Sequence, residues 1–504
     1  MDFMGSLITG LSVACEPNNL FFCFMGVFIG TLIGVLPGLG PVATMSILLP
    51  VTYGISATTA IIMLSGIYYG AYYGGSTTSI LVNIPGETAS VITCLDGYQM
   101  ARQGRAGPAL GIAAFGSFIA GTVGIIVLQV LAPPLVAVAL KFGAPEYFSL
   151  MVLGLTILIF LAEKSVIKAL MMAGVGTFLG TVGLDTITGV ARFSFDIPEF
   201  LDGLGIVPMA MGLFGIAEIF FNLEKSIKTD VTDAKIGHLL PSLKDWMESK
   251  WAIARGTVVG FFLGILPGGG GVLASFVSYA VEKMVSKNPQ KFGRGAIEGV
   301  AGPESANNAA ASGGYIPLLT LGIPVGVVQA ILLGALMLHG ITPGPMLLKE
   351  HPDLFWGVIA SMYVGNAMLL VLNLPLIGLW VKVLRIPYSI LFPLILLFCL
   401  IGAYAVNNST VDVAIMLFFG VVGYLMRKFE YEPAPFIMAF VLSPIMEQSL
   451  RRSLIISDGH FGIFFATPIS LGCLILAGLL LILAALPAFR KRREKIVTEA
   501  EDMG

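Results

Sequence analysis

Apolar segments long enough to cross a lipid bilayer recur along this chain of 504 residues, since about 20 residues suffice for one helical crossing. Only 12% of the residues are charged, against about 25% in a typical soluble domain. The alternating pattern of a membrane β-barrel is absent. The sequence predicts an all-α, polytopic membrane protein with about 10–13 membrane segments. The candidate spans lie near residues 20–55, 57–84, 108–132, 145–162, 166–184, 203–223, 256–281, 310–341, 354–374, 388–405, 411–426, 434–449 and 462–488.

Two of these spans are interrupted near their centres by nearly the same sequence motif, which is rich in glycine and proline. The first reads GVLPGLGPVA over residues 34–43, and the second reads GILPGGGGVL over residues 264–273. Proline ends a helix, while glycine permits positive φ and lets a ligand approach the backbone. A helix broken inside a bilayer is tolerated only where it lines a cavity or is buried in protein. The half-helix after each break would point its positive N-terminus inward, where it attracts an anion. The alternative is a kink or a close helix contact.

The two halves of the chain match in further places and in the same order. GGSTTSILVNIP at residues 74–85 matches GGYIPLLTLGIP at residues 313–324, which indicates an internal duplication. We therefore divide the chain into five parts. They are a first repeat over 1–223, a cytoplasmic linker over 224–255, a second repeat over 256–450, a C-terminal membrane helix over 451–489 and a cytoplasmic tail over 490–504.

Lysine and arginine give the orientation of the two repeats. None occurs before Arg102, whereas residues 225–255 and 283–294 are rich in them. By the positive-inside rule, the first repeat starts on the outer face and the second starts in the cytoplasm. Such inverted repeats are typical of secondary transporters. Basic residues flank segment 256–281 on both sides, which favours re-entrant hairpins over kinked crossings, although both remain open.

Polar side chains gather in two apolar surroundings, YYGGSTTSILVNIPGE at residues 72–87 and AIEGVAGPESANNAAASGG at residues 296–314. Carboxylates and amides within a membrane usually face a pathway, and oxygen-rich groups suit a hard cation such as Na⁺. The alternative is hydrogen bonding between helices. The candidate substrate-binding residues are Gly38, Gly40, Ser76, Thr77, Asn83, Gly268, Gly269, Gly270, Asn307 and Asn308, and the candidate cation-coupling residues are Thr78, Glu304 and Ser305.

Other functional classes find little support in the sequence. The net charge of −2 means that the chain has no overall excess of positive charge to attract nucleic acid. The glycine-rich motifs lack the βαβ unit that surrounds a dinucleotide-binding turn, and they lack the GK[ST] motif of a phosphate-binding loop. The five cysteines and four histidines are scattered and form no metal or nucleophile motif. We expect no catalysis, no metal and no cofactor beyond Na⁺ as a coupling ion.

The chain resembles the large membrane subunit of the tripartite tricarboxylate transporters, the TctA family. The matching words are GTLIGVLPGLGPVAT, YYGGSTTSILVNIPGE, LDGYQMARQGRAGPAL, AIEGVAGPESANNAAASGGYIPLLTLGIP and LHGITPGP. One departure is IPVG in the second half, where the first half has IPG. The resemblance implies a multi-pass protein of the bacterial inner membrane. It also implies two partners, which are a small integral-membrane subunit and a periplasmic solute-binding protein.

From this resemblance we expect a permease subunit that imports organic carboxylates, such as citrate and other tri- and dicarboxylates, with a Na⁺ or H⁺ gradient. The alternatives are a passive organic-anion channel and an intramembrane enzyme. A channel would conduct without a coupled cation, and an enzyme would need a nucleophile–base pair or a metal cluster. The sequence leaves open which carboxylate is carried and which oligomeric state the chain adopts, a homo-oligomer included.

Overall fold

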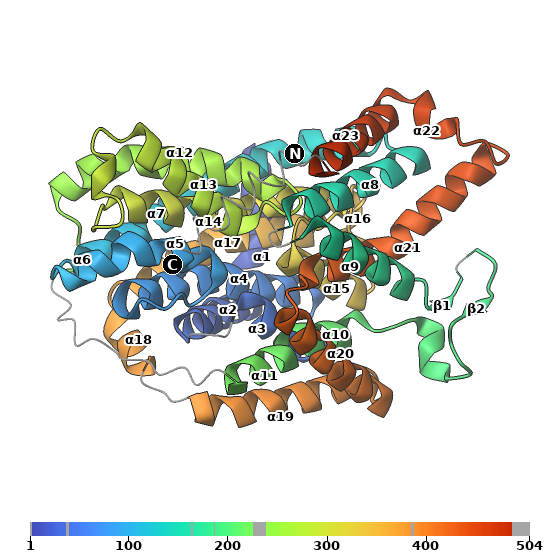
Figure 1. Ribbon diagram of the computed structural model, residues 1–504, viewed down its shortest axis with the longest axis horizontal. Helices are drawn as coiled ribbons and strands as arrows, with labels where there is room; N and C mark the ends of the chain where they lie inside the picture. The colour runs from blue at the N-terminus through green and yellow to red at the C-terminus, as the bar shows by residue number, and fades with distance from the viewer. Residues whose placement is uncertain are drawn as a thin grey trace.

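Helices make up nearly all of the regular structure, which confirms the all-α prediction. The computed structural model describes residues 3–36, 40–162, 165–185, 187–224, 238–384 and 388–485. Within these residues, the one sheet is a two-stranded antiparallel pair, β1 (Gly183–Leu184) with β2 (Ala191–Arg192). Figure 1 shows this pair projecting from the body of the molecule beyond α9 and α21.

The helices divide between the two halves of the sequence. Those of the first half are α1 (Phe3–Ala14), α2 (Pro17–Val35), α3 (Pro41–Leu48), α4 (Ala57–Val82), α5 (Val91–Thr93), α6 (Gln99–Arg102), α7 (Ala106–Ala139), α8 (Ala144–Leu161), α9 (Val166–Leu179), α10 (Ile206–Ala210) and α11 (Ala217–Glu224). Those of the second half are α12 (Leu243–Ile265), α13 (Gly270–Val285), α14 (Glu298–Leu321), α15 (Val327–Leu338), α16 (Leu347–Glu350), α17 (Pro352–Asn373), α18 (Ile377–Val383), α19 (Tyr388–Asn407), α20 (Thr410–Lys428), α21 (Pro433–Ile456), α22 (Ile463–Ala466) and α23 (Pro468–Ala485). The π-helical turn Met211–Ile216 joins α10 to α11.

Six helices in the described part of the chain are long and apolar enough to cross a membrane. They are Pro17–Val35, Ala106–Ala139, Ala144–Leu161, Ile206–Glu224, Pro352–Asn373 and Thr410–Lys428. Helices α4 and α14 have 26 and 24 residues and carry the two polar runs. The protein is therefore a polytopic helical membrane protein, as its composition predicts.

The first broken segment is a helical hairpin, α2–α3. Helix α2 ends at Val35, and α3 begins at Pro41 after the N-cap residue Gly40. The start of α4 then lies beside the start of α2, because the Thr59 hydroxyl donates to Asn19 Oδ1 over 2.6 Å. The segment between these helices has therefore turned back to the end from which it entered. The hairpin prediction is confirmed here, and the kinked crossing is excluded.

The second broken segment, α12–α13, forms the matching hairpin. Arg255 of α12 is bound to Glu282 of α13 through Nε and Nη2, over 2.8 and 2.6 Å. These residues lie on opposite sides of the Pro-Gly break, so the two arms run side by side in opposite directions. A capping box between Ser242 and Asp245 starts α12, which places its first turns inside the range that we predicted as linker.

Each hairpin packs its first arm against the helix that follows the hairpin, and the two run in the same direction. Small residues let these helix backbones approach closely. In the first half, Gly26, Gly30 and Gly34 of α2 lie against Met63, Ile67 and Ala71 of α4. In the second half, Gly256, Gly260 and Gly264 of α12 lie against Gly302, Ala306 and Ala310 of α14.

The two halves are related by an inversion, which follows from the directions of their helices. Helix α7 runs parallel to α14, and α17 runs parallel to α4, whereas α7 and α17 run antiparallel. Helices α4 and α14 are therefore antiparallel, and the two hairpins enter the bundle from opposite ends. The contacts that set these directions are Gly116 with Ser305, Gly124 with Ser312, Gly357 with Thr58, Gly365 with Tyr69, Asn366 with Phe118, and Tyr363 with Gln129.

Late helices of each half pack against the other half. Helix α21 lies along α9, where Ser443 donates to the Thr177 carbonyl over 2.8 Å. Helix α20 lies along the segment 206–224, where Arg427 pairs with Glu218. Figure 1 shows α21 beside α9 and α20 near α10 and α11, away from the group formed by α12, α13 and α14. The two halves are interlocked rather than merely docked.

Candidate functional site

At each break, one backbone group in the described part of the chain is bonded to the helix or loop that follows. The Thr78 hydroxyl donates to the carbonyl of Val35 at the end of α2, over 2.8 Å. At the other break, the Gly268 N–H donates to the carbonyl of Val325 over 2.7 Å. Residues 83–87 and 322–326 are the loops that follow α4 and α14, and Asn83 and Gly322 begin them in the left-handed conformation, with φ of 55° and 70°. Each hairpin tip is thus held by α4 or by the loop after α14 of its own half.

The return arms α3 and α13 begin at the tips with open space in front of them. A Cβ atom placed on Gly40 or on Gly270 would meet no atom within 4 Å. These two glycines occupy matching positions in the repeats, and each stands at the positive N-terminus of a return arm. The binding of an anion in front of these two N-termini stays a prediction.

A buried polar cluster lies between α4 and α14, centred on Glu304, which has no exposed surface. Glu304 Oε2 accepts hydrogen bonds from the Ser76 hydroxyl over 2.6 Å and from Asn307 Nδ2 over 3.2 Å. The Thr93 hydroxyl donates to Oε1. Asn308 Nδ2 donates to Asn307 Oδ1 over 2.8 Å. We call Ser76, Thr93, Glu304, Asn307 and Asn308 the Glu304 cluster.

The chemistry of the Glu304 cluster suits a cation. In the described residues, no lysine or arginine forms a salt bridge with Glu304. A buried carboxylate is stabilised by hydrogen-bond donors or by a bound cation, and hydroxyl, amide and carboxylate oxygens are the ligands of hard cations. Ser76 and Thr77 also line a cavity of about 10 Å³ between α4 and α7, which is about the room that one water molecule needs.

The predicted residues therefore separate into two groups. Ser76, Glu304, Asn307 and Asn308 meet in the Glu304 cluster, with Thr77 at its edge; Gly40, Gly268, Gly269, Gly270 and the exposed Asn83 belong to the hairpin tips and the loop after α4. Thr78 binds the end of α2 instead, and Ser305 faces Gly116 of α7, where its hydroxyl has no hydrogen-bond partner in the described part of the chain. The three residues predicted for cation coupling do not meet at one point. Gly38 lies outside the described residues.

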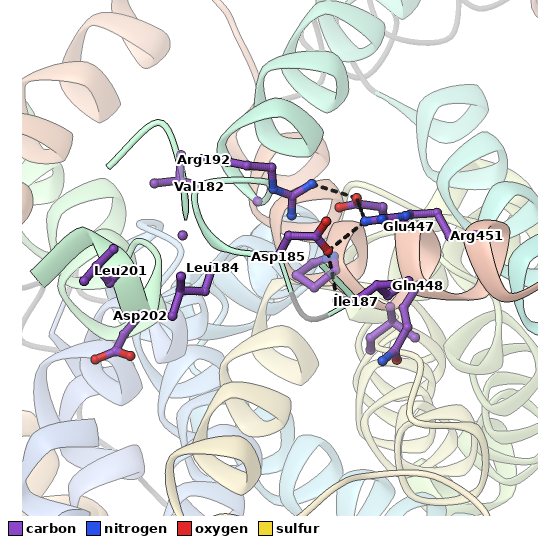
Figure 2. Close-up of a pocket in the computed structure, with 14 residues that line it drawn as sticks. Val182, Leu184, Asp185, Ile187, Arg192, Leu201, Asp202, Glu447, Gln448 and Arg451 are labelled. Carbon is purple, nitrogen blue, oxygen red and sulfur yellow. Dashed lines mark hydrogen bonds and ion pairs between the residues drawn. The ribbon is translucent and has the colours of Figure 1, made fainter. Parts of the chain in front are cut away.

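A second cavity, of about 260 Å³, lies between the strand pair and α21 (Figure 2). Its charged groups are already paired, because Arg451 donates to Asp185 over 2.7 Å and Arg192 donates to Glu447 over 2.7 Å. The Arg451 guanidinium and the Thr188 hydroxyl hold the pKa of Asp185 well below its usual range. Since carboxylates occupy both guanidinium groups, this cavity offers little free positive charge to an anionic substrate.

Sequence reasoning missed two polar residues, Thr93 within the Glu304 cluster and Glu87 near it. Thr93, whose hydroxyl binds Glu304, follows the loop 83–90 in a short helix that leads into the π-helical turn Cys94–Tyr98. Glu87 was within the quoted polar run, but its buried position depends on how the loop folds. A signal existed in the run of small and hydroxyl residues GETASVIT, which is unusually polar for a membrane interior.

Two oppositely directed hairpins, each broken at its tip, define the chain as a polytopic helical membrane protein. The chain belongs to the tripartite tricarboxylate transporter TctA family, whose model matches residues 20–438. It is therefore a subunit of a tripartite tricarboxylate transporter, a system that has further subunits. The family is one of transporters, in agreement with the expectation that the chain is not an enzyme.

Two relatives from Agrobacterium vitis are similar to the chain. An uncharacterized 52.8 kDa protein in the TAR-I ttuC' 3' region is 53% identical over 501 residues, which cover 99% of this chain and 100% of the relative. An uncharacterized protein in the TAR-II ttuC' 3' region is 55% identical over 240 residues, which cover 48% of this chain and 99% of the relative. No solved structure matches the chain.

Proposed function

We propose that the chain is the permease subunit of a binding-protein-dependent secondary transporter of the bacterial inner membrane. It imports organic carboxylates, tri- and dicarboxylates such as citrate, with a Na⁺ or H⁺ gradient. The observation that carries the proposal is the pair of hairpins that enter from opposite ends and present open helix N-termini at Gly40 and Gly270. Family membership supports the tripartite assembly and the carboxylate class of substrate.

A carboxylate with two or three charges is expensive to remove from water. The described parts of the hairpin tips offer no basic side chain, so the positive N-termini of α3 and α13, each equivalent to about half a charge, supply the attraction. The Glu304 cluster then binds the coupling cation, whose charge offsets what remains on the substrate. In this arrangement substrate and cation each favour the binding of the other.

The test is uptake into proteoliposomes that contain this chain and the small membrane subunit, with the periplasmic binding protein added outside. Radiolabelled citrate and a panel of dicarboxylates serve as substrates, and Na⁺ and pH gradients are imposed separately. We expect uptake only with all three proteins and with one of the gradients. Uptake that needs no cation gradient would indicate a passive channel, and full uptake by this chain alone would contradict the dependence on a binding protein.

The variant that tests the cation site is Glu304→Gln. It keeps the side-chain shape but removes the charge that the Ser76, Thr93 and Asn307 side chains surround. Hydrogen bonds to a charged group contribute about 1.5–3 kcal/mol, so we expect gradient-driven uptake to fall by about tenfold or more. Association with the partner subunits should not change. Uptake at the wild-type rate would place the cation site elsewhere.

A further inference from the structure

Glu87 is a second buried carboxylate, and it lies where both hairpins meet the loop after α4. Its side chain is 6% exposed. Its neighbour Gly86 packs so closely on Gly34 of α2 that an added Cβ would lie 1.9 Å from the Gly34 carbonyl oxygen. On the other side, Ser275 of α13 donates to the Ala89 carbonyl over 2.8 Å. The loop that carries Glu87 is therefore held by the first hairpin and by the second.

The two oxygens of Glu87 have different surroundings. Oε2 accepts a hydrogen bond from the Ala89 N–H over 2.8 Å. Among the residues that the structure describes, none gives Oε1 a hydrogen bond, although this atom is buried, and the Cγ atom lies against Gly75 of α4. An unpartnered carboxylate oxygen in such a place is costly when it carries charge. A negative charge is therefore least stabilised at Oε1, so a ligand that offsets this charge would bind at Oε1.

No positive charge compensates Glu87 within the described residues. The titratable groups that act on it are Tyr68 and Tyr72 of α4 and Glu304 of α14, while α2 and α13 face its loop with Gly34 and Ser275. Tyrosine is neutral near neutral pH, and the charge of Glu304 opposes a second negative charge nearby. Ionised Glu87 would thus be both desolvated and repelled.

Glu304 and Glu87 differ in the hydrogen-bond donors that reach their two carboxylate oxygens. Glu304 has three donors to its two oxygens, from Ser76, Thr93 and Asn307, and such donors stabilise a carboxylate. Glu87 is the N-cap residue of the short helix Thr88–Ser90, and its side chain accepts from the backbone N–H groups of Ala89 and Ser90, with no donor to Oε1 among the described residues. No hydrogen-bond donor reaches Oε1 from the described residues, and a Na⁺ ion would require several oxygen ligands at that atom. A proton needs only Oε1 itself.

We propose that Glu87 is a proton-binding residue of the transport cycle. Oε1 carries the proton while both hairpins enclose the loop. When a hairpin moves away and water reaches the side chain, the proton passes from Oε1 to water, and the carboxylate is left ionised and solvated. The role in transport rests on the proposed function, whereas the binding of the proton does not.

The direct test is infrared difference spectroscopy of the purified full chain in lipid nanodiscs during a pH titration. The carbonyl stretch of a protonated carboxylic acid reports the proton without any transported substrate. We expect this band at neutral pH in the wild type and its loss in Glu87→Gln. Glu146→Gln is the matched control, because Glu146 is also 6% exposed but has partners on both oxygens. The control should retain the band.

Three results would overturn the proposal. They are the absence of the band in the wild type, its persistence in a folded Glu87→Gln protein, and its removal by Na⁺ at constant pH, which would identify a metal cation as the ligand. Gel filtration and thermal unfolding establish that Glu87→Gln is folded, and Glu87→Asp should restore a band.

A transport measurement then tests whether proton binding at Glu87 is part of the transport cycle. In the assembled tripartite system, Glu87→Gln should lose citrate uptake driven by a pH gradient but keep citrate–citrate exchange, which needs no net proton movement. Uptake that still follows the pH gradient would contradict a role for Glu87. If the wild type transports none of the carboxylates, the proposed function fails, while the infrared band still decides whether Glu87 binds a proton.

Discussion

Gly40 and Gly268 both belong to the hairpin tips, but their backbones differ. Gly268 has φ of +76°, a conformation that costs a residue with a side chain roughly 1–2 kcal/mol. Gly40 has φ of −82° with open space around it, so any residue fits there. The backbone conformation requires glycine at position 268, whereas the conformation at position 40 does not, and we attribute glycine there to the proposed substrate.

This difference predicts how paired substitutions behave. Gly268→Ala should lower the free energy of unfolding by about 1–2 kcal/mol, and Gly268→Val should abolish uptake. Gly40→Val should leave stability unchanged but reduce uptake, because the added methyl groups fill the space before α3. Thermal unfolding in detergent and citrate uptake measure the two effects. Near wild-type uptake in both valine variants would mean that the tips are structural breaks and that the substrate binds elsewhere.

The composition of the Glu304 cluster was predictable from sequence only in part. Ser76, Glu304, Asn307 and Asn308 stood out as polar groups in apolar surroundings. Which neighbours join them depends on helix geometry, since each residue is rotated by about 100° from the last. Thr78 is therefore turned to α2, and Ser305 is turned to α7. Thr93 lies in the short helix α5, after a loop whose path is set by tertiary contacts.

At the scale of elements, each hairpin arm is held against its neighbour by a row of glycines. A Cβ atom on Gly260 would lie 2.1 Å from the carbonyl oxygen of Ala306. Backbone on one helix cannot yield as a side chain does, so any larger residue forces α12 away from α14. The hairpin depends on this contact for its position.

Gly260→Val should therefore lower the free energy of unfolding by about 1–3 kcal/mol and reduce uptake. Val258→Leu is the matched control, because Val258 lies on the same helix with 58% of its surface exposed. Thermal unfolding of both variants in the same detergent is the measurement. Equal stability of the two would show that α12 and α14 can separate without cost.

The hairpins themselves could be predicted from sequence. A Pro-Gly motif ends a helix at its own position, and basic residues mark the membrane face of the segments that they flank. The polar run at residues 296–314 was harder to place. We expected a span near 310–341, whereas α14 begins at Glu298 and includes nearly the whole run, and α15 is separate. The partners that stabilise these polar residues lie on α4 and α7, far away in sequence, so hydropathy alone excludes them from a span.

For the whole molecule, the inversion predicts that the open ends of the hairpins lie on opposite sides of the membrane. Tyr53, after α3, is 59% exposed, and Leu243, at the start of α12, is 86% exposed. Replaced singly by cysteine on a cysteine-free background, they should react with an impermeant thiol reagent from opposite faces. We expect position 53 to be labelled from the periplasm and position 243 from the cytoplasm. Labelling of both from the same face would contradict the inverted arrangement.

The exchange of late helices between the halves has a consequence for how the protein is made. Helix α9 leaves the ribosome roughly 250 residues before its partner α21 exists, which is a delay of about 10–50 s at roughly 5–20 residues per second. During that delay the face of α9 around Gly176 is covered by lipid or by the insertion machinery. A nascent chain that stops before residue 433 therefore lacks the helix that packs against this face of α9.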